Sequence, residues 1–369
     1  MKYYIIAGEA SGDLHGSNLI RELKKFDTAA TIRCWGGDMM RDAGGNLVKH
    51  YRDLAFMGFV EVVSNLRTIF RNLKFCKEDI LGFKPDAIIL IDYPGFNLRI
   101  AKWAKQQGLK VIYYISPQVW AWKENRVKMM KECIDKMLVI LPFEKEYYKN
   151  KWNWDVEYVG HPLVEVIENQ KSRVGSQESA KKIIALLPGS RKQEISVKLP
   201  IMLEVVKSFP GYEFVIAQAP SLEESFYKAF TDPYPNVSSV KNKTYDLLSQ
   251  STAALVTSGT ATLETALFAV PEVVCYRGSL ISYQIAKRVI KVKYISLVNL
   301  IMDKLVVHEL IQNELTPANL IKELNELLND KARIAELKKD YADLKKILSE
   351  GGNASAKAAK LIIEFVGRI

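Results

Sequence analysis

The chain has 369 residues, of which 48% are hydrophobic and 25% charged, and a formal net charge of +10. Its length suits about two domains, and its composition is that of a folded globular protein, which excludes a fibre or a disordered chain. Four cysteines without paired spacing argue against a disulfide framework and a zinc site, and no segment approaches the ~20 apolar residues of a spanning helix.

The N-terminus enters a strand pattern at once and shows no signal peptide, so we expect a cytoplasmic protein. Its positive charge suits nucleic acid, anionic lipid or anionic metabolites, or a basic surface that only favours solubility. The lysines are spread along the chain without a compact basic arm, so we expect no nucleic-acid partner.

In the first half, short apolar runs alternate with amphipathic stretches. The predicted strands are Tyr3–Ala7, Thr31–Trp35, Ala87–Ile91, Lys110–Ile115, Lys136–Ile140 and Val156–Val159. This rhythm predicts an α/β domain at 1–167, with a parallel sheet covered by helices on both faces.

A polar segment at 168–182 is typical of a linker, and the strand–helix rhythm then restarts. The strands predicted beyond it are Ile183–Leu187, Glu213–Ala217, Val237–Val240, Ala253–Thr257 and Glu272–Tyr276. We therefore predict a second doubly wound domain at 183–330 and a helical tail at 331–369, with a helix break near 350–353. Ligands of such sheets bind beyond the carboxyl ends of the strands, so the loops that follow strands are the candidate sites.

The loop after the first strand carries Glu9, Ser11, Asp13 and His15. It lacks the glycine spacing and the lysine of nucleotide-binding loops, and two carboxylates would repel a pyrophosphate. We expect these four residues to face a sugar acceptor; the alternative is a structural turn in which Ser11 or Asp13 caps the next helix.

Asp92 follows the most apolar strand of the first half, in a turn fixed by Pro94 and Gly95. A carboxylate at the end of a parallel strand could accept a proton from an attacking hydroxyl. The alternative is a turn-capping aspartate that is bonded to backbone amides.

Two strand–turn–helix loops of the second half suit a diphosphate nucleotide. Gly189 and Ser190 open a helix start that can bind phosphate, and Arg191 adds a cationic fork, although Ser190 could simply cap the helix. The small residues Ser258, Gly259 and Thr260 let a ligand lie against the backbone. Glu264, which follows them, could accept hydrogen bonds from both ribose hydroxyls. It does not fit a capping box, because Ala261 stands three residues before it.

No paired-carboxylate D-x-D motif occurs. His308 and Glu309 could begin a zincin motif, H-E-x-x-H, but Gln312 stands where its second histidine would be. We therefore expect neither a metal nor another cofactor. A metal-free enzyme must neutralise a departing diphosphate with helix dipoles and with Arg or Lys, which the loop at Arg191 offers.

Seven motifs in order resemble those of the lipid-A-disaccharide synthase family. They are Gly8–Asp13, Met57–Val62, Ser116–Trp122, Leu141–Glu144, Gly160–Pro162, Leu187–Arg191 and Ser258–Glu264. The resemblance implies a GT-B fold, in which two Rossmann-like domains face each other across a cleft and the second binds the donor. It also implies an inverting, metal-independent transfer from UDP-2,3-diacylglucosamine to 2,3-diacylglucosamine 1-phosphate (lipid X) in lipid A biosynthesis.

In that family the residues matching Asp92 and Arg191 are associated with activity, and Glu264 matches the nucleotide-sugar glutamate. Asn299 and Gln312 fall where the resemblance completes the donor pocket. The sequence departs from the family at Lys241–Thr244, where relatives often have a glycine-containing loop on the uracil side, and at Gly95, which replaces an acidic residue.

A helix from Phe59 would place Phe59, Val62, Leu66, Phe70 and Leu73 on one face, with basic residues beside it. This pattern favours an interfacial helix at the anionic inner face of the inner membrane, and the alternative is a helix that buries the stripe in the core. Trp120 and Trp122, followed by basic residues, suggest a second membrane edge or core tryptophans.

Other functions also fit these patterns. One is a GT-B enzyme that acts on UDP-N-acetylglucosamine, such as a peptidoglycan transferase or a 2-epimerase. Another is a non-catalytic lipid- or nucleotide-binding protein, which would not need both Asp92 and Arg191. The helical tail could fold back on the first domain or reach a partner in a homo-oligomer.

Overall fold

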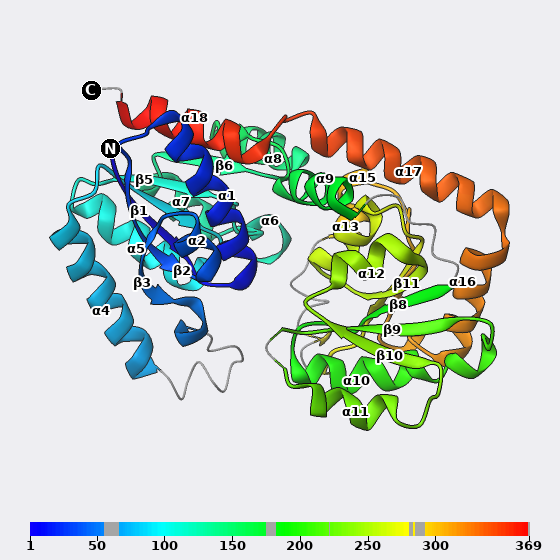
Figure 1. Ribbon diagram of the computed structural model, residues 1–369. Helices are drawn as coiled ribbons and strands as arrows, with labels where there is room; N and C mark the ends of the chain where they lie inside the picture. Colours follow the sequence, from blue (N-terminus) through cyan, green and yellow to red (C-terminus); the bar gives the residue numbers. More distant parts are fainter. Residues whose placement is uncertain (55–65, 175–181, 221, 280–282, 285–291, 368–369) are drawn as a thin grey trace. The chain divides into compact units, whose positions relative to one another are not determined.

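The computed structural model describes residues 1–54, 66–174, 182–220, 222–279, 283–284 and 292–367, and the chain divides into two compact units. The first unit consists of Met1–Pro162 and Leu348–Ile369, and the second of Leu163–Ile347. Each is built around a parallel sheet with helices packed on it, as the strand–helix rhythm predicts (Figure 1).

Seven parallel strands form the first sheet, in the order β3-β2-β1-β4-β5-β6-β7. They are β1 (Lys2–Ala7), β2 (Thr31–Gly36), β3 (Asn46–His50), β4 (Ala87–Ile91), β5 (Lys110–Tyr114), β6 (Lys136–Val139) and β7 (Glu157–Tyr158). The six predicted strands are confirmed. The sequence analysis missed β3, an edge strand whose residues are partly exposed and therefore not uniformly apolar.

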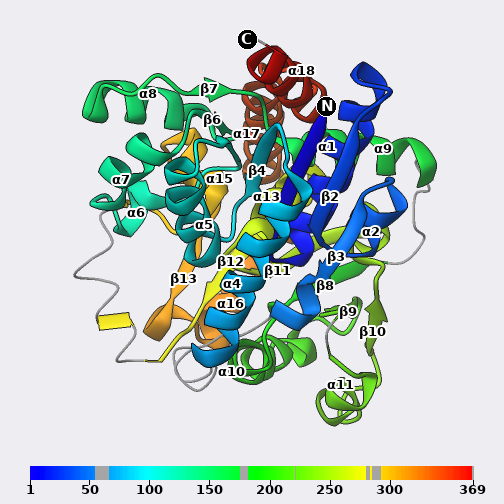
Figure 2. The same cartoon turned by 90° about the vertical axis from the view of Figure 1, so that its left-hand side faces the viewer.

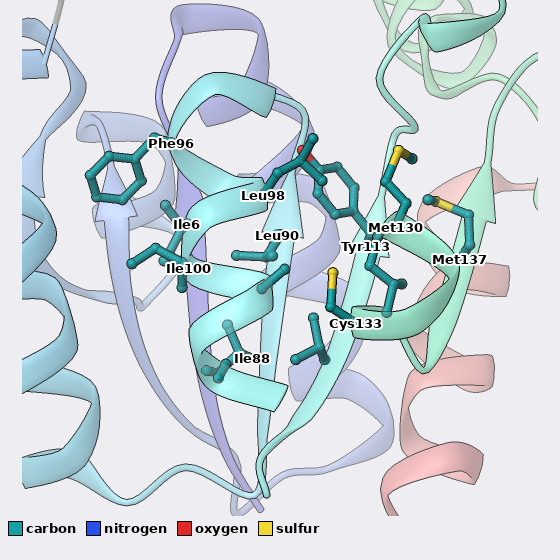
Figure 3. Close-up of a cluster of buried hydrophobic side chains, with 14 of the residues drawn as sticks. Ile6, Ile88, Leu90, Phe96, Leu98, Ile100, Tyr113, Met130, Cys133 and Met137 are labelled. Carbon is teal, nitrogen blue, oxygen red and sulfur yellow. The ribbon is translucent and has the colours of Figure 1, made fainter. Parts of the chain in front are cut away.

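The helices of the first unit are α1 (Ala10–Phe26), α2 (Asp38–Asp42), α4 (Leu66–Phe83), α5 (Pro94–Gln106), α6 (Val119–Trp122), α7 (Arg126–Cys133), α8 (Pro142–Trp152) and α18 (Ala354–Gly367), with a 3-10 turn at Tyr51–Leu54. They cover both faces of the sheet. Tyr3 and Ile5 point to the core shared with α1 and α18, whereas Tyr4 and Ile6 point to the core shared with α4, α5 and α7, part of which is shown in Figure 3. Because both faces are covered, the central strands are apolar throughout.

The C-terminal helix α18 belongs to the first unit and lies beside α1 (Figure 1). Its Ala358, Ile362 and Val366 are buried in the same core as Leu19 and Leu23 of α1. The predicted tail therefore divides between the units: α17 (Lys331–Ser349) lies almost wholly in the second, and α18 folds back on the first. The break between these helices is confirmed.

Six parallel strands form the second sheet, in the order β10-β9-β8-β11-β12-β13 (Figure 2). They are β8 (Ile183–Leu187), β9 (Glu213–Gln218), β10 (Val237–Lys241), β11 (Ser251–Thr257), β12 (Glu272–Tyr276) and β13 (Glu309–Ile311). The five predicted strands are confirmed. The short edge strand β13 was not predicted, because three residues are too few to show a pattern.

The second unit contains α9 (Pro162–Val174), α10 (Lys192–Leu203), α11 (Glu224–Thr231), α12 (Thr244–Gln250), α13 (Thr260–Leu267), α15 (Leu297–Met302), α16 (Pro317–Asn329) and α17, with 3-10 turns at Val206–Ser208 and Gln312–Glu314. The structure agrees only in part with the linker that was predicted at 168–182. Residues 168–174 continue α9, which buries Leu163 and Ile167 and leaves its polar side exposed, and residues 175–181 lie outside the described part. In the described ranges, no helix has the length and apolarity to cross a bilayer.

Both sheets reverse their strand order at the centre, between β1 and β4 in the first unit and between β8 and β11 in the second. At such a reversal the connections leave toward opposite faces of the sheet, so a crevice opens beyond the carboxyl ends of the two strands. The four loops singled out from the sequence follow these four strands. The topology therefore concentrates the predicted site residues at two places, one in each unit.

Candidate functional site

The carboxyl ends of β8 and β11 frame a pocket of about 290 Å³ in the second unit. Six of the predicted donor residues line it: Gly189, Ser190, Ser258, Gly259, Thr260 and Glu264. They come from sequence segments about 70 residues apart, and the pairing of β8 with β11 brings them together. The pocket lies wholly within one unit.

The loop after β8 presents backbone amides to this pocket. Gly189 has a φ of +120°, a backbone conformation that residues with a side chain rarely adopt, so glycine is favoured at this turn. The N-cap residue of α10 is Arg191 rather than Ser190, which corrects the alternative of a simple Ser190 cap, and no side chain caps it. The first amides of α10 therefore stay available for an anion.

Arg191 lies at the mouth of this loop, with its side chain 59% exposed and Nη1 3.4 Å from Glu194 Oε1. It is not one of the residues lining the pocket, so its guanidinium must turn inward to touch a ligand there. Glu194 does line the pocket, on the first turn of α10. The sequence analysis missed it, although its position three residues after Arg191 was a signal for an ion pair.

Glu264 lies in α13, five residues after the N-cap Gly259, and is not part of a capping box. One of its carboxylate oxygens accepts a hydrogen bond of 2.9 Å from the hydroxyl of Tyr245. Burial raises the pKa of Glu264, and the bond from Tyr245 partly opposes that rise. This bond fixes the carboxylate at the pocket wall, where its other oxygen can accept from a ligand hydroxyl.

Two buried polar groups at the pocket floor were also missed by the sequence analysis. Gln218 and Thr257 are the last residues of β9 and β11, and both line the pocket. Gln218 Nε2 donates to Ser239 Oγ at 2.8 Å. Among the described residues, Gln218 Oε1 and Thr257 Oγ1 have no hydrogen-bond partner.

Asn299 does not reach the pocket, in contrast to the expected donor contact. It is fully buried, and its Oδ1 accepts from the amides of Val306 and Val307 at 2.8 and 2.9 Å. Its Nδ2 donates to Val307 O and Glu309 Oε1 at 2.8 and 2.9 Å. Because these bonds use both ends of its amide, Asn299 holds the segment before β13 in place.

Gln312 is buried and has a φ of +55°. Its Oε1 accepts from the amide of Gly278 at 3.4 Å, and its Nε2 has no partner within the described ranges. It does not line the pocket, but it keeps a free donor at the end of β13.

In the first unit, the loops after β1 and β4 are packed against each other. A Cβ on Gly8 would lie 2.3 Å from the ring of Tyr93, so this glycine is required by a close approach. Asp92 and Tyr93 both have positive φ, 43° and 50°, which is strained for residues with side chains. Two hydrogen bonds to the carbonyl oxygen of Asp92 stabilise this strained conformation, one from Asn97 Nδ2 at 2.7 Å and one from the Tyr113 hydroxyl at 2.5 Å.

The Asp92 side chain is half-buried beside Glu9. Burial raises its pKa to about 7, and the charge of Glu9 adds to the rise. The N-cap residue of α5 is Tyr93, so Asp92 does not cap that helix. The backbone amide of Tyr93 does bond to the Asp92 carboxyl, as the alternative of a turn-capping aspartate requires, and this bond partly opposes the rise in pKa. A strained loop that holds a carboxyl with a pKa near neutrality suits a group that exchanges protons.

The four residues predicted for the acceptor separate into different roles. Asp13 is buried and accepts from the amides of Gly37, Met40 and Met39 at 2.7, 3.0 and 3.2 Å, so it caps α2 and is not available to a ligand. Glu9 occupies the N-cap position of α1 without a capping bond, and Ser11 is exposed on the first turn.

His15, the fourth of these residues, is buried. Burial lowers its pKa to about 4, and its Nδ1 has no partner among the described residues. His161 is buried close enough for the charge of His15 to lower its pKa as well, which falls to about 3 mainly through burial. Both imidazoles are therefore neutral at physiological pH.

Of the predicted membrane stripe, Phe59, Val62 and the side chain of Leu66 lie outside the described part of the chain, in which α4 runs from Leu66 to Phe83. The rest of the stripe is divided. Phe70 is 64% exposed, whereas Leu73 is buried in the core, so Leu73 fits the alternative of a helix that buries its stripe. The two tryptophans of the second predicted membrane edge also differ in exposure. Trp120 is buried and donates a hydrogen bond to Glu144 at 3.2 Å, and Trp122 is 52% exposed.

The sequence comparisons extend over nearly the whole chain. The family model described as lipid-A-disaccharide synthetase matches residues 3–365. The lipid-A-disaccharide synthase of Geobacter metallireducens is 37% identical over 380 residues, which cover 99% of this chain and 97% of that protein. The lipid-A-disaccharide synthase of Syntrophus aciditrophicus is 39% identical over 375 residues, with 98% and 97% covered.

Solved structures with low sequence identity share the fold. A UDP-GlcNAc 2-epimerase from Neisseria meningitidis, bound to UDP-GlcNAc, matches with a TM-score of 0.65 at 14% identity over 100% of both chains. The glycotransferase of kitacinnamycin matches with a TM-score of 0.69 at 15% identity over 99% of both chains. These likenesses establish the GT-B type of fold. The family model that matches residues 3–365 and the relatives at 37% and 39% identity show that the chain belongs to the lipid-A-disaccharide synthase family.

Proposed function

We propose that this enzyme of lipid A biosynthesis, which has lipid-A-disaccharide synthase activity, transfers the sugar of UDP-2,3-diacylglucosamine to lipid X with inversion and without a metal. The observation that carries the proposal is the pocket between β8 and β11. It unites amides at two helix starts with a half-buried glutamate, and these are groups that suit a diphosphate and a ribose.

Within this pocket, the diphosphate of UDP lies against Gly189 and Ser190 on one side and Ser258–Thr260 on the other. Arg191 turns inward to reach it, and the ribose hydroxyls bind the free oxygen of Glu264. Thr244, the last residue of the segment that departs from the family pattern, also lines the pocket and is available to the base. Support comes from the positive φ of Gly189 and Gly259, which opens both loops to close approach.

The donor site predicts a specific pattern of UDP affinities. Arg191→Ala and Glu264→Ala should each weaken UDP binding by about 10- to 100-fold, since hydrogen bonds to charged groups contribute roughly 1.5–3 kcal/mol. Isothermal titration calorimetry with UDP measures this, and Lys192→Ala on the exposed side of α10 is the control. Unchanged affinity in both variants would rule the site out.

We further propose that the first unit binds an anionic membrane surface near the start of α4, which suits lipid-tailed substrates. Exposed Phe70 is flanked by the exposed basic residues Arg67, Arg71 and Lys74. The inner side of the same helix is anchored by Asp79, which accepts from Tyr4 at 2.6 Å and from Arg33 at 2.6 and 2.8 Å. An apolar residue within a basic surface on a fixed helix is typical of peripheral attachment.

Phe70 and Leu73 give a matched pair to test this attachment. Phe70→Ser should reduce sedimentation with phosphatidylglycerol vesicles several-fold and leave the unfolding midpoint unchanged, because Phe70 is mostly exposed. Leu73→Ser should instead destabilise the protein by about 2–5 kcal/mol, because it empties a core position. Binding should also fall as salt rises. Equal sedimentation of Phe70→Ser and the unchanged protein would remove this face from consideration.

A further inference from the structure

Behind the proposed diphosphate loop lies a buried lysine that the function has not yet used. Lys198 is in the second turn of α10, and its side chain is only 2% exposed. Its Nζ lies 3.6 Å from the position that a Cβ on Gly189 would occupy, so the ammonium group is directly beneath the loop. A lysine is almost never buried to this extent unless it is paired.

The pairing of Lys198 is loose and shared. Its Nζ is 3.8 Å from Glu194 Oε2, and the other oxygen of the same carboxylate is 3.4 Å from Arg191 Nη1. Within the described residues, Glu194 is the only carboxylate within 4.0 Å of either cation. Two cations therefore share one anion, which leaves about one unbalanced positive charge at the loop.

This arrangement is costly without an anionic ligand. Removing an ammonium group from water costs several kcal/mol, and a single carboxylate 3.8 Å away offsets this only in part. In agreement, burial lowers the pKa of Lys198, and the charge of Glu194 only partly restores it. A phosphate bound at Gly189 would supply the missing negative charge in surroundings where water screens it little.

A positive charge at this position would assist one stage of the reaction in particular, the departure of UDP. When UDP departs, its terminal phosphate ionises with a pKa near 6, so it carries about one more negative charge than the bound donor. A buried, fixed cation stabilises the more negative state more strongly and needs no reorganisation. An exposed arginine such as Arg191 cannot do this alone, because solvent screens it and its side chain must move.

We propose that Lys198 stabilises the diphosphate electrostatically, holding a fixed positive charge beneath the Gly189 loop that favours the departing UDP over the bound donor. The inference rests on the proposed donor site. It assigns a role to a residue that neither the motifs nor the pocket lining singled out. The ligand it recognises is a pyrophosphate group rather than a base or a sugar.

The test is a series of titrations with uridine, UMP and UDP on Lys198→Met, which keeps the length of the side chain and removes its charge. UDP affinity should fall by about 10- to 100-fold, UMP affinity by less, and uridine affinity should not change. The turnover number should fall by a larger factor than KM changes. Lys192→Met is the matched control, because Lys192 is exposed on the same helix with its Nζ 5.5 Å from the ring centre of Phe226.

Two results would overturn the role of Lys198 alone: UDP affinity within twofold of the unchanged protein, or uridine weakened as much as UDP, which indicates a collapsed pocket. If Lys198→Met does not fold, Lys198→Gln is read by the same criteria. If the proposed donor site is wrong, the binding measurements give a different result. In that case UDP does not bind the unchanged protein, or it binds Arg191→Ala and Glu264→Ala with normal affinity.

Discussion

Replacing Asp92 by Asn is expected to lower turnover by ~10²–10⁴-fold, the loss typical of a missing general base, and to leave UDP affinity nearly unchanged. The side chain keeps its shape and loses its basicity. We propose that Asp92 deprotonates the acceptor hydroxyl as it attacks the anomeric carbon. It follows β4 in a strained loop of the first unit, whereas the residues proposed for the diphosphate belong to the second.

The environment of Asp92 also predicts the pH dependence. Burial and the charge of Glu9 raise its pKa to about 7, and the ionised form is the base, so turnover should rise as pH increases through about 7 and then level off. The measurement is mass spectrometry of the disaccharide formed from both substrates at pH 5.5 to 8.5. In Glu9→Gln, the same profile should move to lower pH, because one of the two causes of the raised pKa is gone.

Folding must be controlled in this experiment, and the sign of the linkage makes that possible. Between about pH 4 and 7 the folded protein keeps a proton on Asp92 that the unfolded chain has released, so ionising Asp92 costs stability as pH rises. Asp92→Asn removes that cost and should be at least as stable as the unchanged protein at pH 8. The nearest rival base is His15. Near-normal turnover in Asp92→Asn, together with its loss in His15→Gln, would transfer the role to the histidine.

The second large effect concerns acid stability, and we expect His15 and His161 each to cost the first unit stability as pH falls below 6.5. His15 and His161 are buried with pKa values of about 4 and 3, against an ordinary value of 6.5. As pH falls below 6.5, the unfolded chain binds protons on these histidines that the folded unit does not. The contribution of these histidines to stability is therefore full above pH 6.5 and declines by about 1.4 kcal/mol per pH unit for each histidine down to about pH 4. Asp92 and Glu144, whose pKa values burial raises to about 7, contribute in the opposite direction over this range.

Tryptophan fluorescence isolates this effect, because all six tryptophans of the chain lie in the first unit. Urea unfolding at pH 7.5, 6.5, 5.5 and 4.5 measures the free energy of unfolding of the unchanged protein and of His15→Gln. Between pH 6.5 and 4.5, the stability of His15→Gln should rise relative to that of the unchanged protein by about 1.4 kcal/mol per pH unit, because this variant lacks one of the two histidines. His308→Gln, in the second unit, is the control. Parallel declines in the unchanged protein and His15→Gln would show that other groups drive acid unfolding.

Much of the fold followed from local pattern. Continuous apolar runs such as Ala87–Ile91 and Ile183–Leu187 predicted buried parallel strands, and both have these bounds in the structure. The edge strands β3 and β13 were not predicted. β3 is partly exposed and β13 has only three residues, so neither shows a continuous apolar run. The second half of α9, residues 168–174, was predicted as a linker, because its polar exposed residues are also typical of one.

For the candidate site, too, the local sequence determined some features and the tertiary structure others. The sequence alone determined that glycine-containing loops with Arg191 and Glu264 follow strands, because turn residues and strand ends are local features. Only the tertiary structure decided which polar residues remain free for a ligand. Asp13 and Asn299 pair with backbone amides of other segments, whereas Lys198 is left beneath the Gly189 loop with a shared partner. Hydrogen-bond satisfaction and burial depend on which segments of the folded chain meet, and no local pattern of residues specifies this.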